Sequence, residues 1–296
     1  MGNTSYDSSN RVNVSYRSST GETYASRTAY FNSASVDEIF AQQKERKAHE
    51  SMSPMNLGKR VCADSDTHPF TVPIIINLDV TGSMGRIPQQ LIKDGLPTLM
   101  STLIQNGTKD ASLLFVAIGD HTCDKFPLQV GQFESGDEEL DLWLTRTYLE
   151  GSGGGNNGES YLLAWLVGAF HTQLDSFDKR GKKGFLFTIG DEPCLNNLSS
   201  SAVRELIGSG ERSYTAEELL NEAKKMYNVY HLHVTETSSG KASIGYWKSL
   251  MGQNCIEIND THQLPKIISD TILSHEDTVV TSTDNSNSII DSEIML

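Results

Sequence analysis

The sequence has no run of apolar residues long enough to cross a membrane, and its start lacks the apolar stretch of a signal peptide. A membrane-spanning helix needs about 18 to 20 consecutive apolar residues. Only four cysteines occur in 296 residues, and no two form a Cys-x-x-Cys pair. Without secretory features, such cysteines are expected to be reduced thiols. We therefore expect a cytoplasmic protein that is not bound to a membrane.

Positive charge is also scarce, with 24 Lys and Arg against 38 Asp and Glu and a net charge of −14. Nucleic-acid binding requires clustered Lys and Arg that neutralise phosphates. The densest basic run, 179–183, lies between a helical pattern and a strand and is interpreted as a solvated loop. We therefore expect no nucleic-acid partner. A zinc site at His121 and Cys123 is disfavoured because paired-ligand spacing is absent.

Residues 1–69 differ in composition from the rest of the chain. The first 35 are rich in Ser, Thr, Asn, Tyr and Arg and bury little core. The alternation at 12–16 suggests a strand or hairpin, and Ser35, with an acid three residues later, predicts a capped helix. We interpret 1–69 as a polar N-terminal arm, partly disordered or used for docking, between which composition does not decide.

From residue 70 onward, short apolar runs alternate with helical patterns. Strands are expected at 73–78, 112–118, 128–133, 184–189, 229–234 and 255–258, and helices at 88–104, 138–144, 160–174, 215–227 and 263–273. Strands separated by helices imply right-handed crossovers and a sheet covered on both faces. We predict an α/β fold for 70–275, a three-layer α/β/α, doubly wound domain with a mainly parallel six-stranded sheet. Residues 276–296 are interpreted as an acidic, flexible tail.

Oxygen-bearing side chains follow the predicted strands at the sheet edge where doubly wound folds bind ligands. Asp79-Val80-Thr81-Gly82-Ser83 follows the first strand, and Asp191 follows the fourth. Alternate residues of a tight turn can face one side, so Asp79, Thr81 and Ser83 are expected to converge. Carboxylate and hydroxyl oxygens suit Mg²⁺ or Mn²⁺.

Simpler interpretations exist for each of these residues. Asp79 would also serve as a helix cap, but a second strand-end carboxylate at Asp191 would then repel it without a cation. Thr81 and Ser83 would also satisfy turn amides. Glu159 and Glu192 are interpreted as acids at helix starts, and His121 as a structural residue.

The Asp79–Ser83 segment resembles the Asp-x-Ser/Thr-x-Ser motif of von Willebrand factor A (vWA) domains, the core of their metal-ion-dependent adhesion site (MIDAS). Asp191 resembles the later aspartate of that family. The loop 151–160 is similar to the Gly-Gly-Gly-Asp-x-Pro-Glu form of hemicentin-like and alpha-kinase-associated vWA domains. Three motifs in the right order within 70–275 form a specific signal, whereas one alone would be weak.

The resemblance implies one ion, Mg²⁺ or Mn²⁺, held by the side chains of Asp79, Thr81, Ser83, Asn157 and Asp191. A free coordination position would receive an Asp or Glu carboxylate from a partner protein. The sequence departs from the family at the third ligand, because Asn157, or Asn156 beside it, replaces the usual Thr. Relatives that work beside AAA+ ATPases or kinases make such a partner an expectation by analogy alone.

We expect a metal-dependent protein-binding module that is not an enzyme. Two alternatives remain open from the sequence. A hydrolase using the same ion would need a general base, for which only His121 and Glu192 are placed. A structural assembly component would instead act through the arm of residues 1–69.

Overall fold

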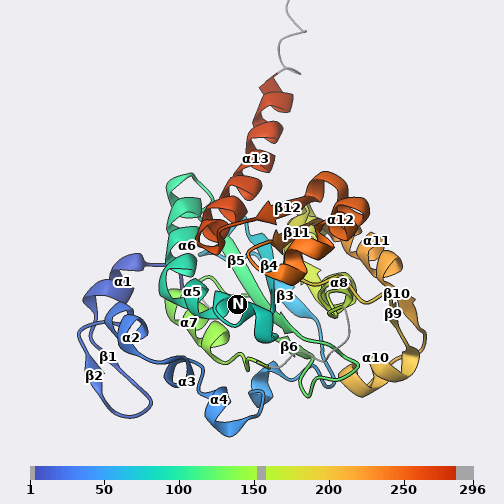
Figure 1. Cartoon of the computed structure of the whole chain (residues 1–296). Coiled ribbons are helices and arrows are strands. Elements are labelled where there is room, and N and C mark those ends of the chain that lie inside the picture. Colours follow the sequence, from blue (N-terminus) through green and yellow to red (C-terminus); the bar gives the residue numbers. More distant parts are fainter. Residues whose placement is uncertain (1–3, 152–157, 285–296) are drawn as a thin grey trace, which may run out of the picture.

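The computed structural model describes residues 4–151 and 158–284, with side chains described as far as His275. A six-stranded sheet forms its centre (Figure 1), in the order β12-β11-β8-β4-β5-β6. All neighbours pair in parallel except β5 and β6. The strands are β4 (Val72–Asp79), β5 (Ala111–Ile118), β6 (Leu128–Val130), β8 (Gly184–Gly190), β11 (Tyr227–Val234) and β12 (Cys255–Ile258). The predicted α/β class and the mainly parallel six-stranded sheet are confirmed.

Two hydrophobic cores lie on the two faces of the sheet. Ile74 and Ile76 of β4 point into one core and Ile75 into the other, because side chains alternate along a strand. The first core is covered by α5 (Ile87–Gln90), η3 (Leu91–Gly95), α6 (Leu96–Gln105), α7 (Asp137–Thr145) and α13 (Leu264–Asp284). The second is covered by α8 (Leu162–Phe170), α11 (Ala216–Met226) and α12 (Ser238–Met251). With helices on both faces, loops at the strand ends remain accessible.

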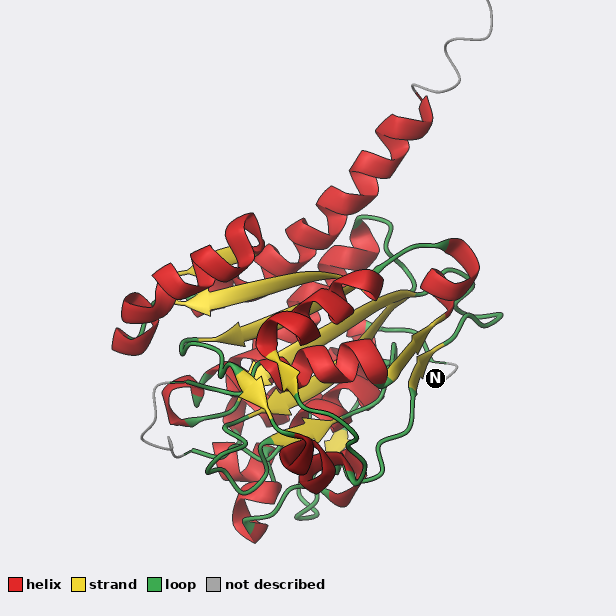
Figure 2. Cartoon of the chain, turned by 90° about the vertical axis from the view of Figure 1, so that its right-hand side faces the viewer, coloured by secondary structure: helices red, strands yellow, loops and turns green. Residues whose placement is uncertain are grey.

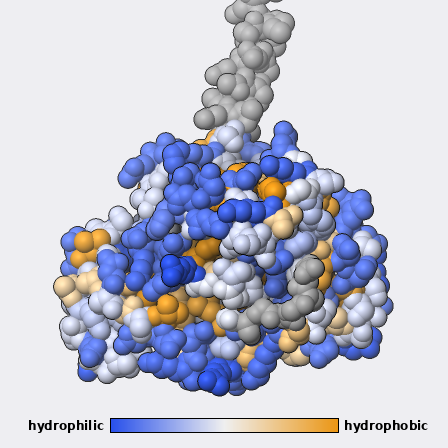
Figure 3. Space-filling view, viewed as in Figure 1, coloured by the Kyte–Doolittle hydropathy of each residue, from blue (hydrophilic) through white to orange (hydrophobic). Residues whose placement is uncertain are grey.

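The strand order reverses at β4, which lies between β5 and β8. The carboxyl ends of the parallel strands meet at one edge of the sheet, where the arrowheads of the long strands lie together on the left of Figure 2. Figure 3 looks onto this edge and shows hydrophilic residues around smaller hydrophobic areas. The edge is therefore the place where a ligand is expected in a fold of this kind.

Several predicted helices differ in extent from the observed ones. The helix predicted at 160–174 ends at Phe170, and β7 (Thr172–Leu174) then pairs with β3 (Arg60–Cys62). The last helix continues from 273 to Asp284, since no Gly or Pro interrupts it after Pro265. The flexible tail predicted from 276 is thus helical to Asp284, and 285–296 lie outside the described residues. Five further helices and strands were not predicted: α9 (Asp175–Arg180), β9 (Asn197–Leu198), α10 (Ser200–Ile207), β10 (Tyr214–Thr215) and α12.

One predicted helix, 88–104, contains a π-helical turn, η3, between α5 and α6. The amide of Leu96 donates to the carbonyl of Leu91 rather than to that of Ile92. Pro97 has no amide hydrogen to donate to the carbonyl of Lys93. The carbonyls of Ile92 and Lys93 are thus left for donors from outside the helix.

The N-terminal arm is built of short elements packed against α7 and η3, at the left of Figure 1. Ser35 forms the predicted capping box with Glu38, whereas residues 8–13 are helical where a strand was expected to begin at 12. Besides β3, its elements are α1 (Ser8–Asn13), β1 (Tyr16–Arg17), β2 (Thr23–Tyr24), α2 (Arg27–Ser33), α3 (Val36–Ile39), α4 (Gln42–Glu45) and η1 (Glu50–Met52). No helix in the described part of the chain is both long and apolar enough to span a membrane.

Candidate metal centre

The candidate centre lies at the carboxyl ends of β4 and β8. Leu78 pairs with Ile189, so Asp79 at the end of β4 and Asp191 just beyond β8 emerge from neighbouring strands. After Asp79 the chain turns through Thr81 into a short 3₁₀ helix, η2 (Gly82–Met84). This turn, residues 79–85, is called the metal turn below.

Asp79 and Asp191 each accept a hydrogen bond from a hydroxyl of the metal turn. Thr81 Oγ1 donates to Asp79 Oδ1 at 2.6 Å, and the Thr81 amide donates to the same oxygen at 2.9 Å. Ser83 Oγ donates to Asp191 Oδ1 at 2.9 Å. The structure therefore brings together four of the five residues predicted as ligands. The fifth, Asn157, lies outside the described residues.

The two carboxyl groups are buried close enough to influence each other. Asp79 is 1% exposed and Asp191 0%. Burial foremost, together with the negative charge of Asp191, raises the pKa of Asp79 to about 7, against the hydrogen bonds from Thr81 and Tyr161. Asp191 Oδ2 has no hydrogen-bond partner among the described residues. A buried carboxylate oxygen without a donor fits a cation ligand.

Glu159 is a third acid of the centre, and its prediction as a helix-start acid was wrong. Helix α8 begins only at Leu162, while the amide of Glu159 donates to the carbonyl of Pro193 at 2.9 Å. Glu159 is 5% exposed, and its Oε2 has no hydrogen-bond partner among the described residues. Burial and the nearby charges, that of Asp79 foremost, raise the pKa of Glu159 to about 9.

Tyr161 was not singled out by its sequence, yet it contacts the centre directly. Its hydroxyl donates to Asp79 Oδ2 at 2.7 Å, and the ring is fully buried. Gly190 makes room for it, since a Cβ at that position would lie 1.8 Å from the tyrosine oxygen. Because Gly190 has no side chain, Tyr161 can pack against β8 and orient one carboxylate oxygen of Asp79.

Helix α12 and β11 support the segment after β8 from behind. Ser243 Oγ donates to the backbone carbonyl of Asp191 at 2.7 Å, and Trp247 Nε1 donates to that of Glu192 at 2.9 Å. The ring of Trp247 stacks on His231 with 3.4 Å between centroids. Because α12 was not predicted, this support could not be foreseen.

His121 and Cys123, which were considered as zinc ligands, contact different partners. His121 Nδ1 lies 2.7 Å from Ser160 Oγ, and Cys123 Sγ lies 3.1 Å from Asp120 Oδ2. Within residues 4–151 and 158–284, no three His, Cys, Asp or Glu side chains are arranged as metal ligands. A metal at the candidate centre would therefore need the hydroxyls of Thr81 and Ser83 beside the carboxylates. An all-oxygen set of this kind suits a hard cation such as Mg²⁺ or Mn²⁺.

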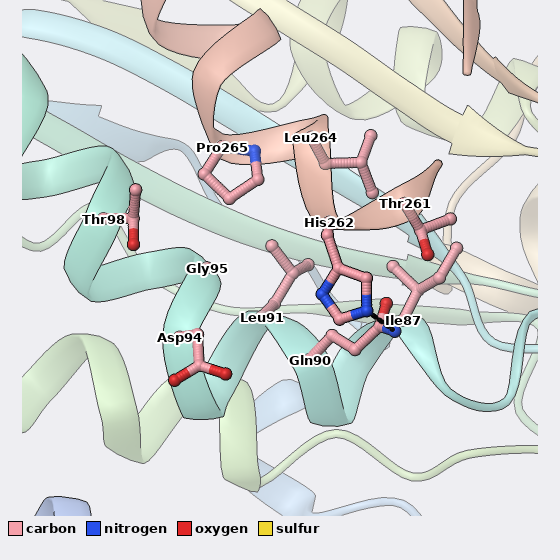
Figure 4. A pocket seen from close by; sticks show the side chains of 10 residues that line it. All are labelled: Ile87, Gln90, Leu91, Asp94, Gly95, Thr98, Thr261, His262, Leu264 and Pro265. Atoms are coloured by element: carbon pink, nitrogen blue, oxygen red, sulfur yellow. Dashed lines mark hydrogen bonds between the residues drawn. The ribbon is translucent and has the colours of Figure 1, made fainter. Parts of the chain in front are cut away.

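A cavity of about 510 Å³ opens beside the exposed Ser83, between the metal turn and the loops after β11 and β12. It adjoins a smaller one of about 60 Å³ between α5, η3 and the start of α13 (Figure 4). Gln90 and His262 line both, with 3.5 Å between Gln90 Nε2 and His262 Nε2. The centre is thus buried on the sheet side and accessible from the side of Ser83.

The fold and site define an α/β domain with an oxygen-rich centre at the carboxyl edge of its sheet. No family model and no curated protein matches the chain. The structure is similar to the pilus adhesin SpaC from Lactobacillus rhamnosus GG in its open conformation, with a TM-score of 0.45 and 11% identity over 74% of this chain and 31% of the adhesin. It is also similar to proximal thread matrix protein 1 from the mussel byssus, with a TM-score of 0.44 and 10% identity over 69% of this chain and 48% of that protein. The chain spans less than half of either protein, and similarities this weak carry no argument about its function.

Proposed function

We propose that this chain is a vWA-type module that binds Mg²⁺ or Mn²⁺ and uses the ion to hold a carboxylate of a partner protein. The observation that carries the proposal is the pair of buried carboxyl groups on neighbouring strands, each bonded to a hydroxyl of the metal turn. A dication would offset the repulsion between Asp79 and Asp191. The resemblance of 79–83 and Asp191 to the MIDAS motif supports the same assignment.

The hydrogen bonds fit metal coordination because a hydroxyl has one proton and two lone pairs. Thr81 and Ser83 donate their protons to Asp79 and Asp191 and keep lone pairs for an ion. The carboxylates in turn orient the hydroxyls, as outer partners commonly do at metal sites. Bound there, the ion would act as a Lewis acid that attracts an incoming carboxylate.

The partner would approach from the side of Ser83, where the 510 Å³ cavity opens. Arg86, Gln90 and His262 line that cavity and offer hydrogen-bond donors around an incoming acidic side chain. We propose binding and not catalysis as the activity of the centre. Partner choice would then depend on these rim residues, since every Asp or Glu presents the same carboxylate to the ion.

Isothermal titration calorimetry with Mg²⁺ and Mn²⁺ tests the metal site. Wild-type protein is expected to take up one ion, whereas Asp79→Ala and Ser83→Ala lose the uptake or weaken it strongly. Asp178→Asn, which changes an exposed acid on α9, is the matched control and should bind as wild type does. No uptake by the wild type, or equal uptake by Asp79→Ala, would contradict the proposal.

Water-proton relaxation of bound Mn²⁺ tests the open coordination position. N-acetylglutamate amide, a single carboxylate, should displace water from the ion and lower the relaxation enhancement. N-acetylglutamine amide, which is matched in size but neutral, should leave it unchanged. An enhancement that neither compound alters would show that the ion offers no position to a carboxylate.

A further inference from the structure

Two glutamine side chains hold two consecutive residues, Tyr148 and Leu149, in the segment that leads to Gly151. Gln129 on β6 binds Tyr148, donating from Nε2 to its carbonyl and accepting its amide at Oε1, both at 2.9 Å. Gln43 of the arm binds Leu149 in the same way: its Nε2 donates to the Leu149 carbonyl at 2.9 Å, and its Oε1 accepts from the Leu149 amide at 3.0 Å. Each primary amide thus pairs with both backbone groups of one residue, as a neighbouring strand would.

The segment held in this way contacts the metal turn two residues later. The amide of Gly151 donates to the carbonyl of Val80, which lies between Asp79 and Thr81, at 3.4 Å. Glu150 Oε1 accepts from the amide of Phe126 at 2.6 Å and fixes the segment from its other side. Residues 148–151, called the strap below, therefore lie between the arm and the metal turn.

A second contact of the arm reaches the helix that follows the metal turn. Arg11, fully buried, donates to the carbonyl of Ile92 and, at 3.5 Å, to that of Lys93, the two carbonyls that the π turn and Pro97 leave without their usual helical partners. Its Nε also donates to Asp141 Oδ2 at 3.0 Å.

Arg27 completes this anchor through ion pairs with Asp137 and Asp141 on α7. Burial raises the pKa of Asp141 to about 6, while both guanidinium groups oppose the rise. Asp141 is therefore ionised at neutral pH, and the pairs with Arg11 and Arg27 are charged. Buried charges of this kind are costly to separate, so the arm is an integral part of the fold rather than a loose appendage.

We propose that the arm, through Gln43, positions the strap against the metal turn and so sets the affinity of the metal site; this inference rests on the proposed function. Without Gln43, the amide and carbonyl of the buried Leu149 lose their partners, and the strap no longer fixes the backbone at Val80. Outer contacts that orient metal ligands typically change affinity by about 10- to 100-fold. Coupling is reciprocal, so a bound ion must also hold the arm more firmly.

The matched pair Gln43→Ala and Gln42→Ala tests this in the full chain. Gln42 is the neighbouring residue on α4 and lies at similar exposure, without a hydrogen bond to the strap. Titration with Mg²⁺ and Mn²⁺ should show about tenfold weaker binding for Gln43→Ala and unchanged binding for Gln42→Ala. Equal affinity of both variants would overturn the inference. Should Gln43→Ala not fold, Gln43→Met, which keeps the length of the side chain but makes neither hydrogen bond to Leu149, is judged by the same criterion.

Hydrogen exchange separates failure of this inference from failure of the proposed function. The amides of Leu149 and Gly151 should exchange faster in Gln43→Ala than in Gln42→Ala, whether or not any metal binds. Equal exchange would refute the positioning by Gln43. A wild type that takes up no ion would refute the metal site itself, and with it the coupling.

Trypsin provides the reciprocal measurement at the exposed Arg46 and Lys47 of the arm. Mg²⁺ should slow their cleavage in the wild type and in Gln42→Ala, and have a smaller effect in Gln43→Ala. Cleavage that saturating Mg²⁺ leaves unchanged in a wild type known to bind the ion would contradict the coupling between arm and site.

Discussion

At the scale of single residues, the candidate metal centre depends on a few buried hydrogen bonds to its aspartates. One carboxylate oxygen of Asp79 accepts hydrogen bonds from the hydroxyl and the amide of Thr81. The other accepts a hydrogen bond from the Tyr161 hydroxyl. The aspartates and the two hydroxyls were evident from the spacing of 79–83 and the position of Asp191. Tyr161 was not evident, because nothing in a sequence shows which buried aromatic residue turns its hydroxyl towards a strand end.

Tyr161→Phe should weaken Mg²⁺ binding by about tenfold, since one oxygen of Asp79 loses its orienting donor. Calorimetry measures the effect. Tyr227→Phe is the control, because Tyr227 is equally buried but donates to Thr172 Oγ1 at 2.8 Å, away from the metal turn. Both variants should lose about 1 kcal/mol of stability. Equal metal affinity of the two variants would show that Tyr161 does not orient Asp79.

Gly190→Ala should destabilise the protein by about 1 to 3 kcal/mol, because the added Cβ would collide with the Tyr161 hydroxyl in a packed interior. Gly245→Ala, on α12 with open space at its Cβ, should instead be neutral or stabilising by up to about 1 kcal/mol. Urea unfolding of both variants measures this. A Gly190→Ala protein as stable as the wild type would contradict the close approach of Tyr161.

At the scale of elements, strands were easier to predict than helices. The buried runs at 73–78, 112–118 and 184–189 were found because residues covered on both faces form continuous apolar stretches. Helix α12 was missed because its residues 238–245 are mostly small and polar, and its burial becomes apparent only against β11 and the segment after β8. Glu159 was misassigned for a related reason. The glutamate that ends the Gly-Gly-Gly-Asp-x-Pro-Glu pattern was a signal for it, but its burial depends on pairing with residues beyond β8.

The histidines of β11 should contribute less stability in mild acid. Burial lowers the pKa of His231 well below its usual value, and that of His233 is lowered too, also mainly by burial. In the unfolded chain these histidines take up protons below about pH 6.5, whereas the buried His231 does not. Their contribution to stability is therefore full above that pH and is lost as pH falls below it, whereas Asp79, Asp141 and Glu159, whose pKa values are raised, contribute with the opposite sign.

Urea unfolding of the wild type and of His231→Gln between pH 7.5 and 5 measures the histidine contribution. His231→Gln keeps a hydrogen-bonding side chain but does not titrate, so its stability relative to the wild type should rise as pH falls. A difference in stability between the two proteins that stays the same across this range would contradict the neutral, buried state of His231.

At the scale of the whole molecule, the sheet carries the candidate centre at the carboxyl ends of its strands, and the N-terminal arm packs against α7 and η3. The composition of residues 1–69 did not decide whether the arm is disordered or docks on the rest of the protein. Arg11 and Arg27 are buried through ion pairs with acids that are more than 100 residues distant in the chain. Such long-range ion pairs have no local signal. If the arm positions the metal turn as we propose, metal binding requires the full chain.

The most direct test of the central claim is anomalous diffraction from crystals of the full chain soaked in Mn²⁺. The account predicts one peak between the side chains of Asp79 and Asp191, within about 2.0 to 2.3 Å of oxygens of Ser83 and Asp191. A peak elsewhere, or none at a Mn²⁺ concentration that saturates binding in solution, would contradict it.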